Sequence, residues 1–303
     1  MADPDRPRLA GTPLVSVVVP CVNGLPAIAE CLEALRRQDA DVHAEVVVVD
    51  RCGEATRAVL RERFPEVVIL AAEPGTAIPA LRALGIARSR GPLVAIIEDH
   101  CNVAPGWLSA IDRARRAGHP VIGGAVENAN VDRLVDWAAF FCEYARFMPP
   151  LKGGVVEEVA GNNVVYERDL LGDLEPDAWE FFLHARLKER GVPFHCEPAL
   201  LVSHKKEFGF GRFLEQRYHY SRSFAGMRLA DAPRWRRLLY AAGTPLLPLV
   251  LFGRIAAAVA RRRRHWGVFL ASAPVLAVFL GSWAWGEAVG ALGGPGDSLG
   301  KVE

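Results

Sequence analysis

Short runs of consecutive apolar residues, most of them β-branched, recur along the first hundred positions of the chain. These runs cover residues 14–19, 45–50, 66–70 and 92–100. Segments at about 26–38, 54–64 and 76–89 lie between them and repeat apolar residues at helical spacing. Apolar strands that alternate with helices are typical of a parallel sheet covered on both faces. We therefore predict an α/β fold whose ligands bind beyond the carboxyl ends of the strands.

The pattern becomes mixed after a helix that begins near Pro105. Residues 120–127 read as a strand, and residues 131–147 form an aromatic-rich helix that suits core packing better than a ligand platform. A helix at about 178–190 follows, and then a strand that ends at His204. The second half is thus less regular than the first.

Two long uncharged runs follow, at 238–253 and 266–286. About 20 apolar residues can cross the hydrocarbon core of a bilayer as a helix. However, Pro245 and Pro248 interrupt the first run, and arginines stand on both sides of it. If both arginine clusters stay in the cytoplasm, the two ends of the first run lie on the same side of the membrane, which excludes a single crossing. We predict a membrane-bound tail whose first run is re-entrant or interfacial, and a two-span hairpin is the alternative.

The net charge of +1, from 36 basic and 35 acidic side chains, argues against a protein that coats nucleic acid. The charge is distributed unevenly, because residues 234–303 carry nine Lys or Arg and three Asp or Glu. The six cysteines are dispersed, and the N-terminal residues lack the apolar stretch of a secretory signal. We expect a reduced catalytic body on the cytoplasmic side of the inner (cytoplasmic) membrane.

Polar residues follow the ends of three predicted strands. They are Asn23, Asp50 and the group Glu98, Asp99 and His100. The first strand precedes no GxGxxG motif, and the chain has no GxxxxGK[ST] motif, which disfavours a dinucleotide-binding dehydrogenase and a P-loop phosphotransferase. The carboxylates and the imidazole at 98–100 are side chains that could bind a divalent cation, and such a cation could bridge phosphates. On spacing alone, a turn cluster before Pro105 explains the group equally well.

Three segments of this half form a specific pattern. "VSVVVPCVNG", "VVVVDRCGEAT" and "LVAIIEDHCNVAPGWL" resemble, in order and spacing, the nucleotide-binding half of the inverting family 2 glycosyltransferases with a GT-A fold. The resemblance covers about residues 14–110 and continues less tightly to about residue 206. It implies a mostly parallel sheet sandwiched by helices, with Pro20, Asn23 and Asp50 lining the pocket for the base and ribose.

The DxD motif of that family falls on Glu98, Asp99 and His100. The resemblance implies that Glu98 and Asp99 contact the donor and that Asp99, His100 and His204 hold a divalent cation. His100 departs from the family pattern, and imidazole suits Mn²⁺ better than Mg²⁺, so Mn²⁺ is favoured. His204 could equally be an ordinary histidine at a strand end.

The resemblance also implies a catalytic base, an acid at the start of a helix that faces the acceptor. Glu180 occupies that position, where a helix N-terminus favours an ionised carboxylate. Glu175 and Asp177 are other candidates, and a charge that merely stabilises the helix is the simpler explanation.

Three further residues are predicted to contact the donor nucleotide-sugar. Asn162 and Asn163 lie in a turn and could contact the sugar or diphosphate, although Gly-Asn is also ordinary turn chemistry. Arg217 lies in an arginine-rich and aromatic segment that could neutralise the leaving diphosphate or bind anionic headgroups.

These inferences predict a flexible N-terminus at 1–13, a GT-A domain at 14–230 and a membrane-associated tail at 231–303. The domain divides into a nucleotide-binding half, 14–110, and an acceptor half, 111–230. We predict a metal-assisted hexosyltransferase that uses a nucleotide-diphosphate sugar and a lipid-linked or membrane glycan acceptor. The alternatives are a catalytically inactive relative that binds nucleotide-sugar at the membrane, and a metal-dependent nucleotidyltransferase, for which the chain has no basic triphosphate loop.

Overall fold

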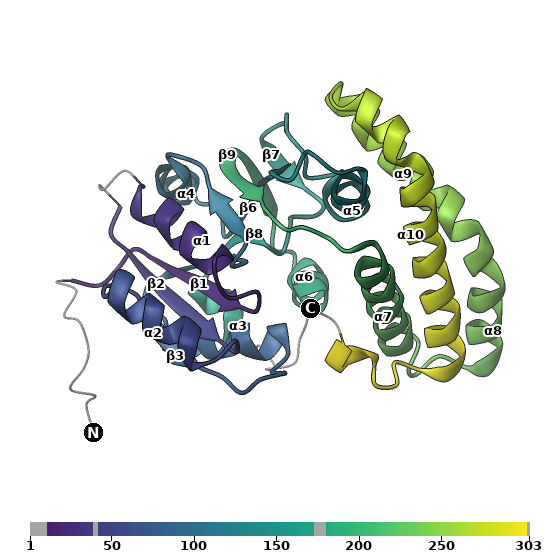
Figure 1. Cartoon of the computed structure of the whole chain (residues 1–303), viewed down its shortest axis with the longest axis horizontal. Coiled ribbons are helices and arrows are strands. Elements are labelled where there is room, and N and C mark those ends of the chain that lie inside the picture. The colour runs from purple at the N-terminus through teal and green to yellow at the C-terminus, as the bar shows by residue number, and fades with distance from the viewer. Residues whose placement is uncertain (1–10, 39–41, 173–179, 302–303) are drawn as a thin grey trace. The chain divides into compact units, whose positions relative to one another are not determined.

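A computed structural model describes residues 11–38, 42–172 and 180–301 (Figure 1). Within these ranges the chain forms two compact units. The first comprises the described residues of Met1–Val126 and Leu151–Ser203, and the second Glu127–Pro150 and His204–Glu303. The predicted segment 1–13 lies mostly outside the described residues, and the predicted domain boundary at residue 230 stays a prediction.

The first unit is built on a mixed sheet with the strand order β3-β2-β1-β4-β8-β6-β9-β5, and β7 pairs with β9. Its strands are β1 (Val15–Cys21), β2 (Ala44–Asp50), β3 (Val68–Ala71), β4 (Leu93–Ile97), β5 (Cys101–Val103), β6 (Val121–Asn128), β7 (Gly154–Val156), β8 (Asn163–Glu167) and β9 (Phe194–His204). Strands β1 to β4 form the parallel part, and β8 pairs antiparallel with both β4 and β6.

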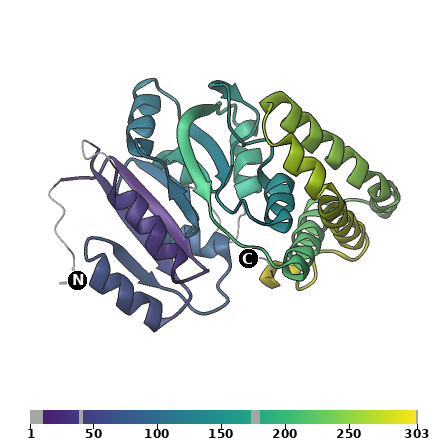
Figure 2. The same cartoon turned by 45° about the horizontal axis from the view of Figure 1, so that its top comes forward.

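Helices connect these strands, and the purple α1 lies alongside the sheet in Figure 2. They are α1 (Ala27–Arg36), α2 (Glu54–Arg63), α3 (Ile78–Arg88), α4 (Trp107–Arg116), the short 3₁₀ turn η1 (Arg168–Leu171) and α6 (Glu180–Glu189). Helix α3 packs against β1 and β2. The fully buried apolar strands β1 and β4 thus lie at the centre of the unit, as their uninterrupted hydrophobic runs predict.

The second unit is helical in the residues that the structure describes. It contains α5 (Leu134–Tyr144), α7 (Phe210–Arg228), α8 (Arg234–Gly243), η2 (Thr244–Leu246), α9 (Leu247–Arg262), α10 (Trp266–Gly293) and η3 (Ser298–Lys301). Two helical stretches, Arg234–Arg262 and Trp266–Gly293, are long and apolar enough to cross a membrane by length and composition. This agrees with the predicted C-terminal hydrophobic helices.

Candidate functional site

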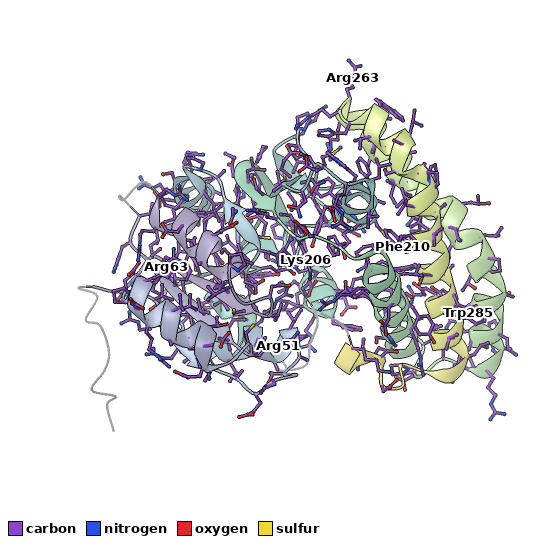
Figure 3. All side chains as sticks on the ribbon, in the orientation of Figure 1. Arg51, Arg63, Lys206, Phe210, Arg263 and Trp285 are labelled. Atoms are coloured by element: carbon purple, nitrogen blue, oxygen red, sulfur yellow. The ribbon has the colours of Figure 1, made fainter. Side chains whose placement is uncertain are left out.

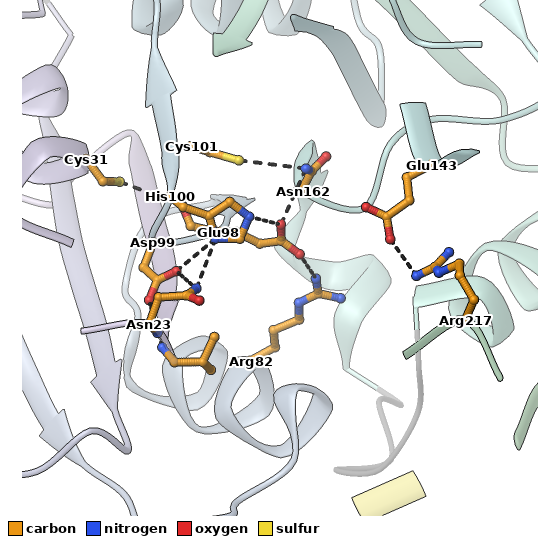
Figure 4. Close-up of polar contacts among 11 residues, drawn as sticks. Asn23, Cys31, Arg82, Glu98, Asp99, His100, Cys101, Glu143, Asn162 and Arg217 are labelled. Atoms are coloured by element: carbon orange, nitrogen blue, oxygen red, sulfur yellow. Dashed lines mark hydrogen bonds and ion pairs between the residues drawn. The ribbon is translucent and has the colours of Figure 1, made fainter. Parts of the chain in front are cut away.

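The turn after β1 is held by a buried carboxylate that comes from the end of β4. Asp99 is fully buried, and its Oδ2 accepts hydrogen bonds from the backbone amides of Val22 (2.8 Å) and Asn23 (2.7 Å). Its Oδ1 accepts from Asn23 Nδ2 (2.7 Å) and contacts His100 Nδ1 (3.0 Å) (Figure 4). Burial alone would raise the pKa of Asp99, but the hydrogen bonds and charge of His100 and the bonds from Asn23 outweigh burial and lower it.

His100 faces a second carboxylate through its other ring nitrogen. His100 Nδ1 lies 3.0 Å from Asp99 Oδ1 and 3.1 Å from Asn23 Nδ2, so a protonated Nδ1 donates to Asp99 and an unprotonated Nδ1 accepts from Asn23. The other ring nitrogen, Nε2, lies 3.2 Å from Glu98 Oε2. A proton on Nε2 or a cation shared by both atoms satisfies this pair.

The donor atoms at this point fit a divalent cation. One ligand atom from each of Glu98, His100 and Cys101 lies within 4.8 Å of the others. A carboxylate and an imidazole held by a second carboxylate form a common ligand arrangement for Mn²⁺ and Zn²⁺. Asp99 uses both oxygens to hold the β1–α1 turn and the imidazole, and its role as a metal ligand stays a prediction.

A buried arginine links this cluster to the start of α6. Arg82, on α3, lies with Nη1 2.5 Å from Glu180 Oε2 and with Nη2 3.7 Å from Glu98 Oε1. Burial would lower the pKa of Arg82, but the charges of Glu180 and Glu98 outweigh it and the net direction is upward. The guanidinium therefore stays charged and fixes two carboxylates from distant parts of the chain.

Glu180 begins α6 and remains about one quarter exposed. A Cβ atom added at Gly161 would lie 2.6 Å from Glu180 Cγ and 2.8 Å from its Oε1. A side chain at this position would therefore have to displace the carboxylate of Glu180. Glu175 and Asp177, the other predicted candidates for the base, lie outside the described residues.

A neutral histidine lies one turn further along α6. The hydroxyl of Tyr166 on β8 lies 2.6 Å from His184 Nε2. Burial lowers the pKa of His184 to about 4, assisted by the charges of Lys188 and Arg82 and opposed by Glu180. Burial and the charge of Glu180 raise the pKa of Tyr166, so the phenol donates and the imidazole accepts.

Asp50, predicted to line the base and ribose pocket, ends β2 and is fully buried. Its carboxylate accepts from the backbone amides of Cys52 and Gly53 and forms an ion pair with Arg57 at 2.9 Å. Pro20 is buried in β1, opposite Val49 of β2. Asn23, Asp99 and the end of β2 thus lie at one edge of the parallel sheet, as predicted.

The two predicted asparagines differ in their surroundings. Asn162 donates from Nδ2 to Glu98 Oε2 (3.4 Å) and to Cys101 Sγ (3.7 Å), so it borders the cluster. Asn163 is fully buried: it accepts from Trp107 Nε1 (3.0 Å) and donates to two backbone carbonyls in β6 and β9. The side chain of Asn163 therefore joins elements of the fold, and its predicted donor contact stays a prediction.

Arg217 and His204 belong to the second unit. Arg217 is buried, lies 2.5 Å from Glu143 Oε1 and stands over the rings of Phe213 and Trp283. His204 is buried, with its ring stacked 6.1 Å from that of Phe208. Their predicted contacts with the diphosphate and the cation stay predictions.

Sequence reasoning missed Arg82, Tyr166 and His184. The available signal for Arg82 is its place on the buried face of α3, beside Leu81 and one turn after Ile78. A charged residue on such a face requires a buried partner. The sequence alone does not identify that partner, because Glu180 is 98 residues away.

Comparisons with known proteins agree with this architecture. Residues 16–173, just over half of the chain, match the family model described as Glycosyl transferase family 2. The chain is 29% identical over 121 residues to glycosyltransferase AglE of Haloferax volcanii, covering 38% of this chain and 40% of that protein. It is 29% identical over 140 residues to the uncharacterized protein y4gI of Sinorhizobium fredii, covering 41% of this chain and 15% of that protein. The chain thus spans less than half the length of these curated relatives.

Three solved structures share the fold. The mannosyltransferase PcManGT from Pyrobaculum calidifontis, in complex with GDP-Man and Mn²⁺, has a TM-score of 0.57 at 17% identity and covers 92% of this chain and 88% of its own. GalNAc-T7 with UDP, GalNAc and Mn²⁺ has a TM-score of 0.52 at 15% identity, with coverage of 66% and 45%. TarS residues 1–349 from S. aureus has a TM-score of 0.50 at 15% identity, with coverage of 91% and 90%. These likenesses confirm the predicted fold.

Proposed function

The chain belongs to glycosyl transferase family 2, and on that premise we propose that it is an inverting hexosyltransferase at a membrane. It moves a sugar from a nucleotide-diphosphate donor to a hydroxyl of a lipid-linked or membrane glycan acceptor. The family membership confirms the resemblance predicted from the three motifs. The observation that carries the proposal is the continuous chain of contacts from Asn23 through Asp99, His100, Glu98 and Arg82 to Glu180.

The donor nucleotide binds along the edge formed by the ends of β1 and β2. Pro20, Asn23 and Asp50 lie at this edge, where ligands bind in open α/β sheets. Asp99 holds the backbone of the β1–α1 turn in place through two amide bonds. We assign Asp50 the ribose and base contact, with Arg57 orienting its carboxylate.

The diphosphate lies near Glu98, His100 and Asn162. Glu98 and His100 would hold a divalent cation, with Mn²⁺ favoured by the imidazole, and when bound it supplies positive charge to the phosphates of the donor. The chain itself orients these two ligands: Asp99 positions His100. Arg82 and Asn162 position Glu98.

Glu180 accepts the proton of the acceptor hydroxyl. Arg82 occupies its Oε2, so Oε1, which lies over Gly161, is the oxygen that receives this proton. The acceptor oxygen then bonds to the anomeric carbon while the bond from that carbon to the diphosphate oxygen breaks. Attack opposite the leaving group inverts the configuration at that carbon.

We place the acceptor at the membrane because the chain carries two long apolar helices flanked by arginines. The cytoplasmic side of the inner membrane is favoured, since all six cysteines are free thiols and arginines are typical of cytoplasmic flanks. Because lipid-linked sugars and membrane glycans are the acceptors present at a membrane, we assign the acceptor to these two classes.

The test uses the purified full chain with Mn²⁺ and a panel of UDP- and GDP-sugars. Release of nucleotide diphosphate is measured with and without membrane lipid extracts as the acceptor source. We expect turnover with at least one donor, and a loss of at least a hundredfold in kcat in Glu180→Gln with donor affinity retained. His100→Ala should raise the Mn²⁺ concentration needed for turnover.

The inactive relative that binds nucleotide-sugar is the competing function, favoured by His100 in place of a carboxylate. It predicts that a donor raises the melting temperature of the protein by mass action without any turnover. Binding without release of nucleotide diphosphate, across Mn²⁺, Mg²⁺ and Zn²⁺, would replace the proposed function with this one.

A further inference from the structure

The C-terminal half of α10 is pressed against the backbone of α7. A Cβ atom at Gly286 would lie 2.3 Å from the carbonyl oxygen of Tyr218, and one at Gly290 would lie 2.2 Å from that of Arg222. The buried carboxylate of Glu287 accepts from Arg228 Nη2 of α7 at 3.2 Å and also bonds to Tyr240 of α8. This end of α10 is therefore fixed to α7 by close packing and a buried ion pair.

Helices α8 and α9 form a hairpin with α10, which turns at residues 263–265, and this turn is tied to the segment that contains α5. Arg264 Nη1 donates to Glu127 Oε2 at 3.0 Å, and Arg262 Nη2 donates to the carbonyl of Arg146 at 2.8 Å. The rings of Phe141 and Phe269 lie 5.4 Å apart, edge to face. The α9–α10 turn is thus attached to the same unit as the other end of α10.

Neither α5 nor α7 suits a bilayer interior. With 11 residues, α5 is about 16 Å long, roughly half of the hydrocarbon core. Helix α7 carries four arginines, at 212, 217, 222 and 228. If the hairpin crossed the bilayer, its attachments would draw these short or charged helices into hydrocarbon, at a cost of several kcal/mol for each charge.

One face of the α8–α10 hairpin is nevertheless apolar and exposed. Large side chains on it include Trp235, Leu239, Leu249, Leu270 and Trp285, each more than 60% exposed. Figure 3 shows Arg263 at the tip of the hairpin, and Trp285 on α10. Exposed arginines at 234, 236, 261 and 263 stand at the two ends of this surface.

We propose that α8, α9 and α10 lie in the plane of one leaflet and do not cross the bilayer. The apolar face enters the boundary between headgroups and acyl chains, and the arginines at its ends meet anionic lipid headgroups. This proposal rests on the membrane association in the proposed function, and it extends the predicted interfacial placement from the first apolar run to both. It explains why exposed Arg254 stands within the apolar α9, since an in-plane helix lets an arginine reach the headgroups.

The test compares two single cysteines on inverted membrane vesicles, whose cytoplasmic face is outward. Arg261→Cys reports on the hairpin tip and Asp231→Cys on the residues before α8, both in a Cys52→Ser background that removes the exposed native thiol. We expect a membrane-impermeant maleimide to label both positions equally in intact and detergent-opened vesicles. Labelling of position 261 that drops below about one tenth until detergent is added would establish a crossing hairpin and overturn the proposal.

A second measurement tests the lipid-facing surface itself. The purified full chain is floated with phosphatidylcholine vesicles that contain or lack 30% phosphatidylglycerol, without any donor or acceptor. We expect binding that anionic lipid strengthens, and at least tenfold weaker binding for the double variant Leu249→Asp and Leu270→Asp. Leu84→Asp, an exposed leucine on α3, is the matched control and should bind as the parent does.

The outcomes separate this proposal from the proposed function, because neither measurement needs sugar transfer. If the parent protein does not bind vesicles, the proposed lipid-binding surface is wrong, whatever the activity of the enzyme. If the double variant binds vesicles normally and is a monomer in solution where the parent is a dimer, this face is assigned to a second copy and the proposal is overturned. Circular dichroism melting confirms that each variant is folded.

Discussion

Gly161 lies directly against the carboxylate of Glu180, so that a Cβ atom there would approach Oε1 to 2.8 Å and Cδ to 2.9 Å. The carboxylate cannot simply swing aside, because Arg82 holds its Oε2. The position of the proposed base therefore depends on the lack of a side chain at Gly161 and on the ion pair with Arg82.

Gly161→Ala should displace this carboxylate while leaving the donor edge of the sheet intact. We expect kcat to fall about tenfold to a hundredfold, since a shift of about 1 Å in a reacting group has effects of this size. Donor affinity should stay within about twofold of the parent. Gly172→Ala is the control, because among the described residues its added Cβ would meet only the carbonyl of Asp169, at 3.8 Å. Unchanged kcat in both variants would contradict the assigned role of Glu180.

Asp99→Asn should destabilise the first unit. The amide replaces one carboxylate oxygen with an NH₂ group that faces N–H donors from Asn23 or Val22, so at least one buried bond is lost. We expect the free energy of unfolding at pH 7 to fall by about 2–3 kcal/mol, as for a buried hydrogen bond to a charged group. Urea denaturation measures it, with Asp231→Asn, at an exposed aspartate, as control. A change below 0.5 kcal/mol would contradict this role of the carboxylate.

The free energy of unfolding should depend on pH through His184. Its pKa is about 4 in the folded chain and about 6.5 when unfolded, so the unfolded state binds more protons between these values. The contribution of His184 to stability is therefore fully present above pH 6.5 and is lost as pH drops, by up to about 3 kcal/mol at pH 4. His184→Gln should flatten this part of the curve, and an identical slope in both proteins would show that other groups cause the dependence.

Arg217→Met should destabilise the second unit, because it leaves the partly buried carboxylate of Glu143 without its ion-pair partner. Glu143 is 19% exposed, so we expect a loss of about 2–3 kcal/mol, at the low end for a broken buried pair. The double variant Arg217→Met and Glu143→Gln should recover part of it. Donor affinity in that stable double variant tests the predicted diphosphate contact: an unchanged value would limit Arg217 to its structural role.

The first half of the fold could be read from the sequence because its signals are local. Predicted strands at 14–19 and 45–50 correspond to β1 and β2, and the predicted helix at 54–64 corresponds to α2. The strand order could not be read, since nothing local indicates that β8 inserts antiparallel between β4 and β6.

The candidate site was predicted only where its residues end strands. Glu98, Asp99 and His100 follow β4, and their proximity to Asn23 is a consequence of parallel strands ending at one edge. Arg82 and Gly161 act through Glu180, which reaches them from a different part of the chain. Such pairings depend on how α3, the β7–β8 loop and α6 meet in space, and neither periodicity nor motif spacing contains that information.

The ion pair between Arg82 and Glu180 also has a consequence for synthesis on the ribosome. Arg82 emerges 98 residues before Glu180, so the nascent parallel sheet carries a guanidinium whose nearest anion has not yet been made. Glu98 emerges earlier but lies farther from Arg82, at 3.7 Å. The parallel part of the sheet therefore completes its electrostatic balance only when α6 leaves the exit tunnel, which couples the maturation of this early segment to the translation of a later one.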